Sequence, residues 1–200
     1  MAGEQKINIV REVLEWIAYF ASAVIIASLL QSQLFALTTV HQSSMQDTLF
    51  EGHMLIMNKV SYYFTEPKKG DIIVFLNGEN TKGFINRYRI FIKDVRLRFQ
   101  KSYRTNRLIK RVIAVPGDTV DICDGKVYIN GEIIEEPYVK GITPPMGSNY
   151  PITLKDGEFF VMGDNRENSS DSRSFGPIKR ENIEGRAMFR IYPFTKIGRP

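Results

Sequence analysis

A serine and a lysine are the residues of this 200-residue chain best suited to covalent chemistry. Ser44 lies in S-S-M-Q-D-T-L, and Lys110 precedes the apolar run V-I-A-V. A lysine at the start of an apolar strand can be withdrawn from water, which lowers its pKa and makes a neutral amine available near pH 7. A neutral amine can take the proton from a serine hydroxyl, which is the Ser-Lys form of nucleophile activation. The ordinary alternative is that Lys110 is one more charge in a basic segment.

The other residue types that support catalysis or metal binding are sparse. His41 lies three residues before Ser44 and is an alternative base, but Lys110 has the better supported environment. The two histidines, His41 and His53, lack the short spacing of a zinc pair, so we expect neither a metal nor another cofactor. The single cysteine, Cys123, allows no internal disulfide, and its position before a turn favours a structural role.

A polar segment near the C-terminus supplies groups that can position a catalytic amine. G-D-N-R-E-N-S-S-D-S-R, residues 163–173, directly follows the apolar run F-F-V-M. Such side chains can hydrogen-bond the backbone of their own loop. We expect an internal Asp171–Arg173 or Asp164–Arg166 pair to hold it. A calcium-binding loop is the alternative, which the arginines and the single glutamate disfavour.

The N-terminal part predicts a membrane anchor. No charged residue occurs from Trp16 to Val40, and a spanning helix needs about 20 mainly apolar residues. A cleavable secretory signal is the alternative, but its apolar core is only about 7 to 15 residues long. Lys6 and Arg11 precede the stretch, so we expect a cytoplasmic N-terminus and residues 41–200 outside. The short connection keeps Ser44 within about 25 Å of the membrane surface.

The rest of the chain is typical of a mainly β, antiparallel domain. Short apolar runs alternate with turn residues, and Asp124-Gly125 and Asn130-Gly131 are typical hairpin turns. We therefore expect short strands in residues 55–60, 71–76, 120–134, 157–163 and 186–193.

A basic segment interrupts this β pattern. Residues 82–111 contain eleven lysines and arginines and one acid, Asp94, in a chain of net charge +5. Apolar side chains recur there at helical spacing, at Ile85, Tyr88, Ile92, Val95, Phe99 and Tyr103. A basic amphipathic helix near an anchor favours anionic lipid as its partner. A solvated hairpin arm is an equal alternative, and nucleic acid is a distant third.

Together, these segments resemble the type I signal peptidases (leader peptidases). S-S-M-Q-D-T-L approximates the serine box of that family, and G-D-I-I-V-F matches its strand box. K-R-V-I-A-V-P-G-D and G-D-N-R-E-N-S-S-D-S-R match its lysine box and its last box, in the family's order behind an N-terminal anchor. The resemblance implies a peptidase domain in residues 41–200, behind an anchor in residues 1–40.

The resemblance also implies roles for individual residues. Ser44 matches the nucleophile and Lys110 the general base, while Ser169 matches the hydroxyl that orients the amine. Asp171 and Arg173 match the pair that braces the loop. The substrates it implies are precursors with small residues before the cut, in the pattern Ala-x-Ala, lying extended beside strands of the domain. We expect the pockets for these residues to be formed by Val40, Met45, Leu49 and Ile109.

The chain departs from the family pattern at three points, of which the last two suggest a specialised member. Gln42 occupies the position of a hydroxyl that helps to bind the oxyanion in some members, and Asp47 replaces a proline. The basic segment, at about 78–108, is longer than is usual. The main alternative is an inactive relative that assists the assembly of surface proteins or pilins. A LexA-like Ser-Lys autoprotease is a second alternative, which the membrane segment disfavours.

Overall fold

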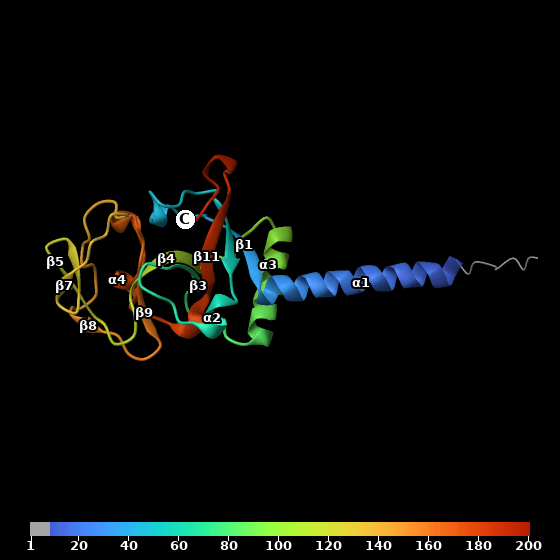
Figure 1. The fold of residues 1–200 in the computed structure, drawn as a ribbon, viewed down its shortest axis with the longest axis horizontal. Helices are drawn as coiled ribbons and strands as arrows, with labels where there is room; N and C mark the ends of the chain where they lie inside the picture. The colour runs from blue at the N-terminus through green and yellow to red at the C-terminus, as the bar shows by residue number, and fades with distance from the viewer. Residues whose placement is uncertain (1–8) are drawn as a thin grey trace, which may run out of the picture.

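The computed structural model describes residues 9–200, in which one long helix extends from a β-rich body (Figure 1). Helix α1 (Ile9–Gln33) has 25 residues, about 37 Å at 1.5 Å per residue, which exceeds the ~30 Å apolar core of a bilayer. It is long and apolar enough to cross a membrane, and most of its apolar side chains are exposed. The helix ends before the uncharged stretch does, because the residues from Phe35 onward pair with a strand.

Seven antiparallel strands form the main sheet, which confirms the predicted fold class. Their order across the sheet is β1 (Phe35–Thr39), β2 (Met54–Asn58), β11 (Ile183–Tyr192), β3 (Ile72–Leu76), β4 (Arg107–Ala114), β9 (Glu158–Met162) and β10 (Ile178–Lys179). β1 lies at one edge and pairs only with β2, so one side of its backbone has no strand partner in the described part of the chain.

A smaller sheet lies at the end of the body farthest from α1 (Figure 1). Its strand order is β7 (Glu132–Ile133), β6 (Lys126–Ile129), β5 (Thr119–Cys123) and β8 (Ile152–Thr153). Asp124, Gly125, Asn130 and Gly131 all have positive φ, as the two predicted hairpin turns require. The predicted three-strand meander is therefore present.

The central strands β3 and β4 separate two hydrophobic clusters. Val74 and Ile109 contribute to one cluster, with Val40 and Met45 from the segment around Ser44. Phe75 and the neighbouring core strands contribute to the other. All five residues of β3 are buried, because apolar side chains cover both of its faces. β4 pairs with this buried strand, with Lys110 opposite Ile73.

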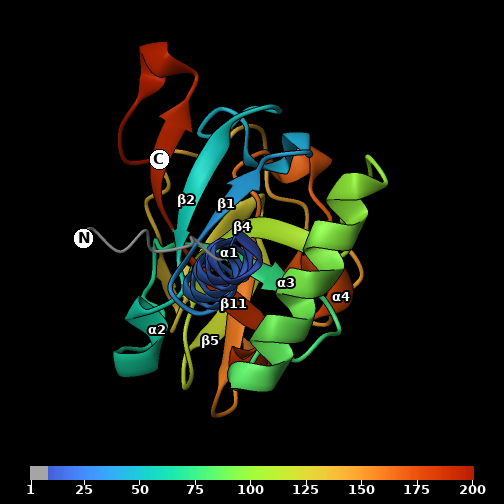
Figure 2. The same cartoon turned by 90° about the vertical axis from the view of Figure 1, so that its right-hand side faces the viewer.

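Helix α3 (Phe84–Phe99) contains most of the basic segment, so the structure has the helix and not the hairpin arm. It lies beside the C-terminal end of α1 and runs across the axis of α1 (Figures 1 and 2). Arg87 Nη1 donates to the carbonyl oxygen of Gln33 at 3.4 Å, and Gln33 Nε2 donates to that of Phe84 at 3.3 Å. The remaining helical turns are short: α2 (Ser61–Phe64), α4 (Ser172–Phe175), η1 (Ser43–Met45), η2 (Arg166–Asn168), η3 (Arg180–Asn182) and η4 (Phe194–Lys196).

The side of α3 that packs against the body differs from the predicted apolar face. Arg87 and Ile90 are its buried residues, whereas Ile85, Ile92 and Phe99 are exposed. The helical spacing was correct, and Ile85 and Ile92 are exposed, while Val95, Phe99 and Tyr103 line a cavity. Arg87 packs inward because it hydrogen-bonds carbonyl oxygens and stacks on the Tyr63 ring at the junction with α1.

Candidate active site

The hydroxyl of Ser44 and the amine of Lys110 are in direct contact, although 66 positions separate them in the chain. Ser44 is in the short helical turn η1 after β1, and Lys110 is in β4. Lys110 Nζ and Ser44 Oγ are 2.5 Å apart. Ser44 is 6% exposed and Lys110 1% exposed. The two groups predicted to react together therefore form a buried hydrogen-bonded pair.

Burial shifts the protonation equilibrium of the lysine. Removal of water disfavours the ammonium form and lowers the pKa of Lys110 to about 8, with Arg173 acting in the same direction. The negative charges of Asp171 and Asp164 oppose this shift. At pH 7 about a tenth of the molecules would then have a neutral amine, compared with fewer than one in a thousand for an ordinary lysine.

The polar loop is held by the predicted pair of Asp171 and Arg173, both fully buried. Arg173 donates to both carboxylate oxygens of Asp171 at 2.9 Å, and the backbone N–H of Gly163 also donates to that carboxylate at 3.0 Å. Burial alone would raise the pKa of Asp171, but the hydrogen bonds and charge of Arg173 outweigh it, and the pKa is lowered. Asp171 therefore stays ionised and fixes the start of the loop.

The other predicted pair, Asp164 with Arg166, does not form, because each residue has a different partner. Asp164 accepts two hydrogen bonds from Arg111 in β4, at 2.9 and 2.7 Å, and one from Thr48 at 2.5 Å. Arg166 donates to Glu136. These contacts connect the loop to β4, to the serine segment and to the segment after β7.

Asparagines that sequence analysis did not single out hold the serine segment in place. Asn165 N–H donates to the carbonyl oxygen of Ser44 at 3.0 Å, and its side-chain amide donates to that of Ser43 at 3.2 Å. Asn168 donates to Ser43 Oγ at 2.8 Å. In the sequence, the only indication of a role for these asparagines was that they belong to a polar loop.

Gly163 is the point of closest approach between the loop and the serine segment. A Cβ atom at this position would lie 2.4 Å from the carbonyl oxygen of Ser44 and 2.3 Å from Ser169 Oγ. Only glycine fits there without displacing the backbone. Ser169 Oγ is buried and, among the described residues, has no hydrogen-bond partner, so a polar group remains available beside the Ser44–Lys110 pair.

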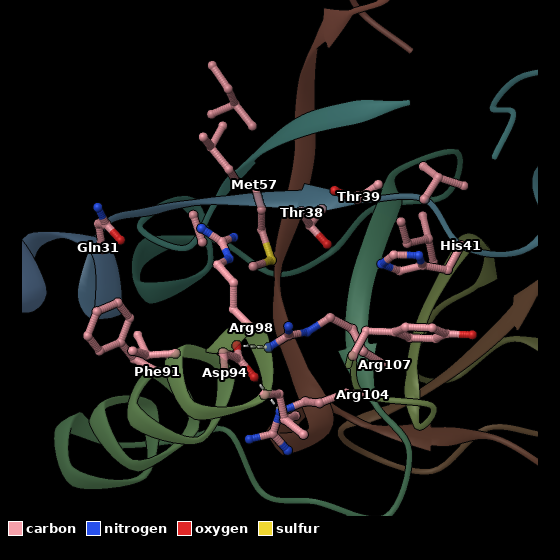
Figure 3. Close-up of a pocket in the computed structure, with 18 of the residues that line it drawn as sticks. Gln31, Thr38, Thr39, His41, Met57, Phe91, Asp94, Arg98, Arg104 and Arg107 are labelled. Carbon is pink, nitrogen blue, oxygen red and sulfur yellow. Dashed lines mark hydrogen bonds and ion pairs between the residues drawn. The ribbon is translucent and has the colours of Figure 1, made fainter. Parts of the chain in front are cut away.

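A large cavity, about 980 Å³, extends from the end of α1 to Ser44. β1 lines it along one side, and α3 with the following loop lines the other (Figure 3). Of the residues predicted to form pockets, Val40, Met45 and Ile109 line the cavity, as does Gln42. Leu49 does not; it is fully buried in the same hydrophobic cluster.

Two residues near Ser44 have partners of their own. The ring of His41 stacks on the ring of Tyr103 at 4.1 Å, and among the described residues no hydrogen bond joins it to Ser44. Asp47 is exposed and faces Lys140 at 3.4 Å.

Within residues 9–200, no group of three or more His, Cys, Asp or Glu residues is arranged to hold a metal ion.

This site has the chemistry of a serine hydrolase. A buried serine hydroxyl lies against a buried amine of lowered pKa, a polar loop holds the serine segment, and a groove ends at this pair. The class of protein that the fold and site define is therefore a β-sheet serine peptidase.

Comparison with known proteins identifies the family. The chain belongs to the signal peptidase family, peptidase S26, whose model matches residues 13–192. It is 37% identical to a probable signal peptidase I-1 from Synechocystis sp., over 88% of this chain and 81% of that protein. It is 38% identical to signal peptidase I from Leptolyngbya laminosa, over 80% and 70% of the two chains, and 30% identical to signal peptidase I from Bacillus licheniformis, over 98% of both. These matches confirm the predicted resemblance to the type I signal peptidases.

Proposed function

We propose that this chain is a membrane-bound serine endopeptidase that removes signal peptides from exported precursors by a Ser44–Lys110 dyad. The observation that carries this proposal is the 2.5 Å contact between a buried hydroxyl and a buried amine of lowered pKa. Membership of the signal peptidase family supplies the substrate class.

The reaction proceeds through a covalent acyl-enzyme. Neutral Lys110 takes the proton of Ser44 as the hydroxyl oxygen attacks the scissile carbonyl. The backbone N–H of Ser44, assisted by the Gln42 amide or acting alone, stabilises the oxyanion of the tetrahedral intermediate. Lys110 then protonates the leaving amine, and water hydrolyses the acyl-enzyme by the same base. Ser169 orients the amine, and Asp171 with Arg173 keeps the loop in position.

The free edge of β1 is the natural binding strand for the precursor. Its backbone lines the cavity along its whole length, and no strand of the described chain pairs with that side. An extended substrate can add there as a further strand through main-chain hydrogen bonds. Val40, Met45 and Ile109 line the cavity near Ser44, and in this proposal they form the walls that select small side chains, in the pattern Ala-x-Ala. Leu49 supports these walls from behind.

The orientation of α1 in the membrane determines on which side of the membrane precursors can reach the site. We place the N-terminus in the cytoplasm and residues 41–200 outside, with α1 crossing the membrane. The groove then opens beside the outer membrane surface, since its lining includes Gln31 near the end of α1. A signal peptide anchored in the same bilayer reaches Ser44 directly.

The test is cleavage of a purified Ala-x-Ala precursor by the full chain in nonionic detergent. Wild-type protein should release the signal peptide, and Ser44→Ala and Lys110→Met should each abolish release without lowering the denaturant concentration at which the chain unfolds. Ser170→Ala is the control, because Ser170 is exposed and its hydroxyl contacts only Ser174 among the described residues, and it should retain most activity. An uncut precursor with wild-type protein would favour the inactive assembly factor, and full activity of Lys110→Met would remove the lysine from the mechanism.

We also propose that α3 lies on the membrane surface and contacts anionic lipid. It runs across the end of the spanning helix, and Ile85, Ile92 and Phe99 are exposed together with basic residues. Apolar side chains in the headgroup layer and cations beside anionic lipid both favour this position.

A nitroxide label at Ile85→Cys tests this placement, with Cys123→Ser removing the native thiol and a label at exposed Ile142→Cys as control. In anionic vesicles, the label at 85 should be protected from a water-soluble nickel complex and the label at 142 should not. Glutamine substitution at four basic positions should reduce the protection: Lys82, Arg89, Arg96 and Lys101. Equal nickel access at 85 and 142 in wild-type protein would contradict the lipid contact.

A further inference from the structure

Five cations line the groove: Lys59, Arg98, Lys101, Arg104 and Arg107. Lys59 is buried and donates to the carbonyl oxygen of Ser32, and two of the other four are neutralised by acids. Arg104 donates to Asp94 at 2.5 Å and pairs with Glu79 at 2.9 Å. Arg107 pairs with Asp94 at 2.6 Å and with Glu184 at 2.6 Å. This network connects α3 to the loop before it, to β4 and to β11. Its charges are satisfied, so these arginines serve to hold the wall in place.

Arg98 differs from these two arginines. Its side chain extends from the last turn of α3 into the cavity toward β1, where Thr38 and Met57 lie opposite (Figure 3). Within residues 9–200, it has neither a hydrogen bond nor an ion pair from its guanidinium. Lys101, which also lines the cavity, likewise has no acidic partner in this range. The single acid on the cavity lining, Asp94, is already occupied by two arginines. The groove therefore has an uncompensated positive charge.

The position of this charge along the groove determines which part of a substrate it meets. Arg98 lies between Gln31, at the end near α1, and His41, near Ser44 (Figure 3). It extends toward β1, whose residues Phe35–Thr39 lie nine to five positions before Ser44. A substrate strand paired with β1 would therefore pass Arg98 about five to nine residues before the bond that is cut.

We propose that Arg98 is a specificity-determining residue that binds an acidic side chain of the precursor at this distance before the cleavage site. This inference rests on the proposed function and narrows its substrate class. Charge complementarity carries it: a guanidinium directed into the substrate groove, with no acid of the chain to pair with, is the natural partner of a carboxylate. A basic residue at the same position of a precursor is repelled by the guanidinium. The groove therefore favours precursors with an acidic residue there and disfavours those with a basic one.

The guanidinium has two other possible partners, which the test must separate. It can donate to main-chain carbonyl oxygens of any bound strand, which would make its contribution independent of substrate charge. It can also contact lipid phosphate, which nonionic detergent removes from the assay. Neither a contact with main-chain carbonyl oxygens nor a contact with lipid phosphate would make the enzyme cleave acidic peptides in preference to basic ones. The proposed role predicts such a preference.

The experiment measures kcat/KM of the full chain in nonionic detergent on Ala-x-Ala peptides with Glu, Gln or Lys at one position, taken in turn from the fifth to the ninth residue before the cut. A partly exposed ion pair changes binding about two- to fivefold, and repulsion acts similarly, so the Glu-to-Lys ratio at the best position should be about tenfold. It should fall severalfold in 0.5 M NaCl because salt screens the pair. Arg98→Gln should bring the ratio close to one.

Arg96→Gln is the matched control, because it removes the same charge from the same helix at an exposed residue that does not line the cavity. It should keep the wild-type ratio. An unchanged ratio in Arg98→Gln would overturn the inference, and so would an equal loss on all three peptides, which would assign Arg98 to main-chain binding. Wild-type protein that cleaves none of the peptides would instead remove the proposed function, together with the inference built on it.

Discussion

Substitution of Gly163 by alanine should damage catalysis far more than stability. The added Cβ would lie 2.4 Å from the carbonyl oxygen of Ser44, whereas ordinary contacts begin near 3.4 Å. Ser169 Oγ can rotate away, but the carbonyl oxygen belongs to the backbone of the nucleophile, so the serine turn must move by about 1 Å. A displacement of this size costs about 10²-fold in rate, whereas overpacking costs about 1–3 kcal/mol of stability.

The assay compares kcat/KM on an Ala-x-Ala peptide with the urea midpoint of the same protein. Gly147→Ala is the control, since a Cβ there meets nothing within 4 Å and the backbone has no positive φ. We expect Gly163→Ala to lose about 100-fold in kcat/KM and Gly147→Ala to match wild type. Activity of Gly163→Ala within threefold of wild type would refute the view that the loop fixes the nucleophile through this contact.

Three further predictions concern the groups around the dyad. Asp171→Asn leaves the Arg173 guanidinium buried without its countercharge, so the free energy of unfolding should fall by about 3–5 kcal/mol; an unchanged urea midpoint would contradict the bracing role. Ser169→Ala removes a buried hydroxyl without a partner, so stability should not fall, while peptide cleavage should slow, though less than in Lys110→Met. The pKa of Lys110 is lowered in the folded state, so the unfolded chain binds this proton more tightly. The free energy of unfolding of wild type should therefore rise by about 3 kcal/mol from pH 8 to pH 10.5, relative to that of Lys110→Met. Parallel pH dependence of the two unfolding curves would show that this amine is not desolvated.

Much of the fold could be predicted because local patterns determine it. Asp124-Gly125 and Asn130-Gly131 adopt the positive φ that their residue types favour, and the strands between them follow. The residue at which α1 ends, on its C-terminal side, could not be predicted in the same way. An uncharged stretch looks the same whether it lies in lipid or joins a sheet, and only the pairing of Phe35 onward with β2 distinguishes them.

The residues of the site could be predicted where they belong to a recognisable motif. Their partners could not be predicted where tertiary contacts determine the pairing. Ser44, Lys110 and the Asp171–Arg173 pair are brought together as expected. Asp164 was expected to pair two residues away, but it binds Arg111 across the sheet, which no local spacing indicates.

The orientation of α3 could not be predicted either, for a related reason. Helical spacing gives the apolar stripe, but it does not say whether protein, lipid or a substrate groove covers that stripe. Arg87 reaches carbonyl oxygens at the end of α1, so it packs inward although it is charged. Ile85 and Ile92 are exposed, whereas Phe99 lines the cavity.

The pH dependence of kcat/KM for peptide cleavage, measured from pH 5 to pH 10 in nonionic detergent, is the most direct test of the proposed role of Lys110. This parameter reports the ionisation of the free enzyme, and the reactive form of Lys110 is the deprotonated amine. We predict that kcat/KM rises tenfold per pH unit in the acidic range and levels off above about pH 8. A rise centred near 6.5, the value of an ordinary imidazole, or one that continues unbroken to pH 10 would contradict a desolvated lysine as the base.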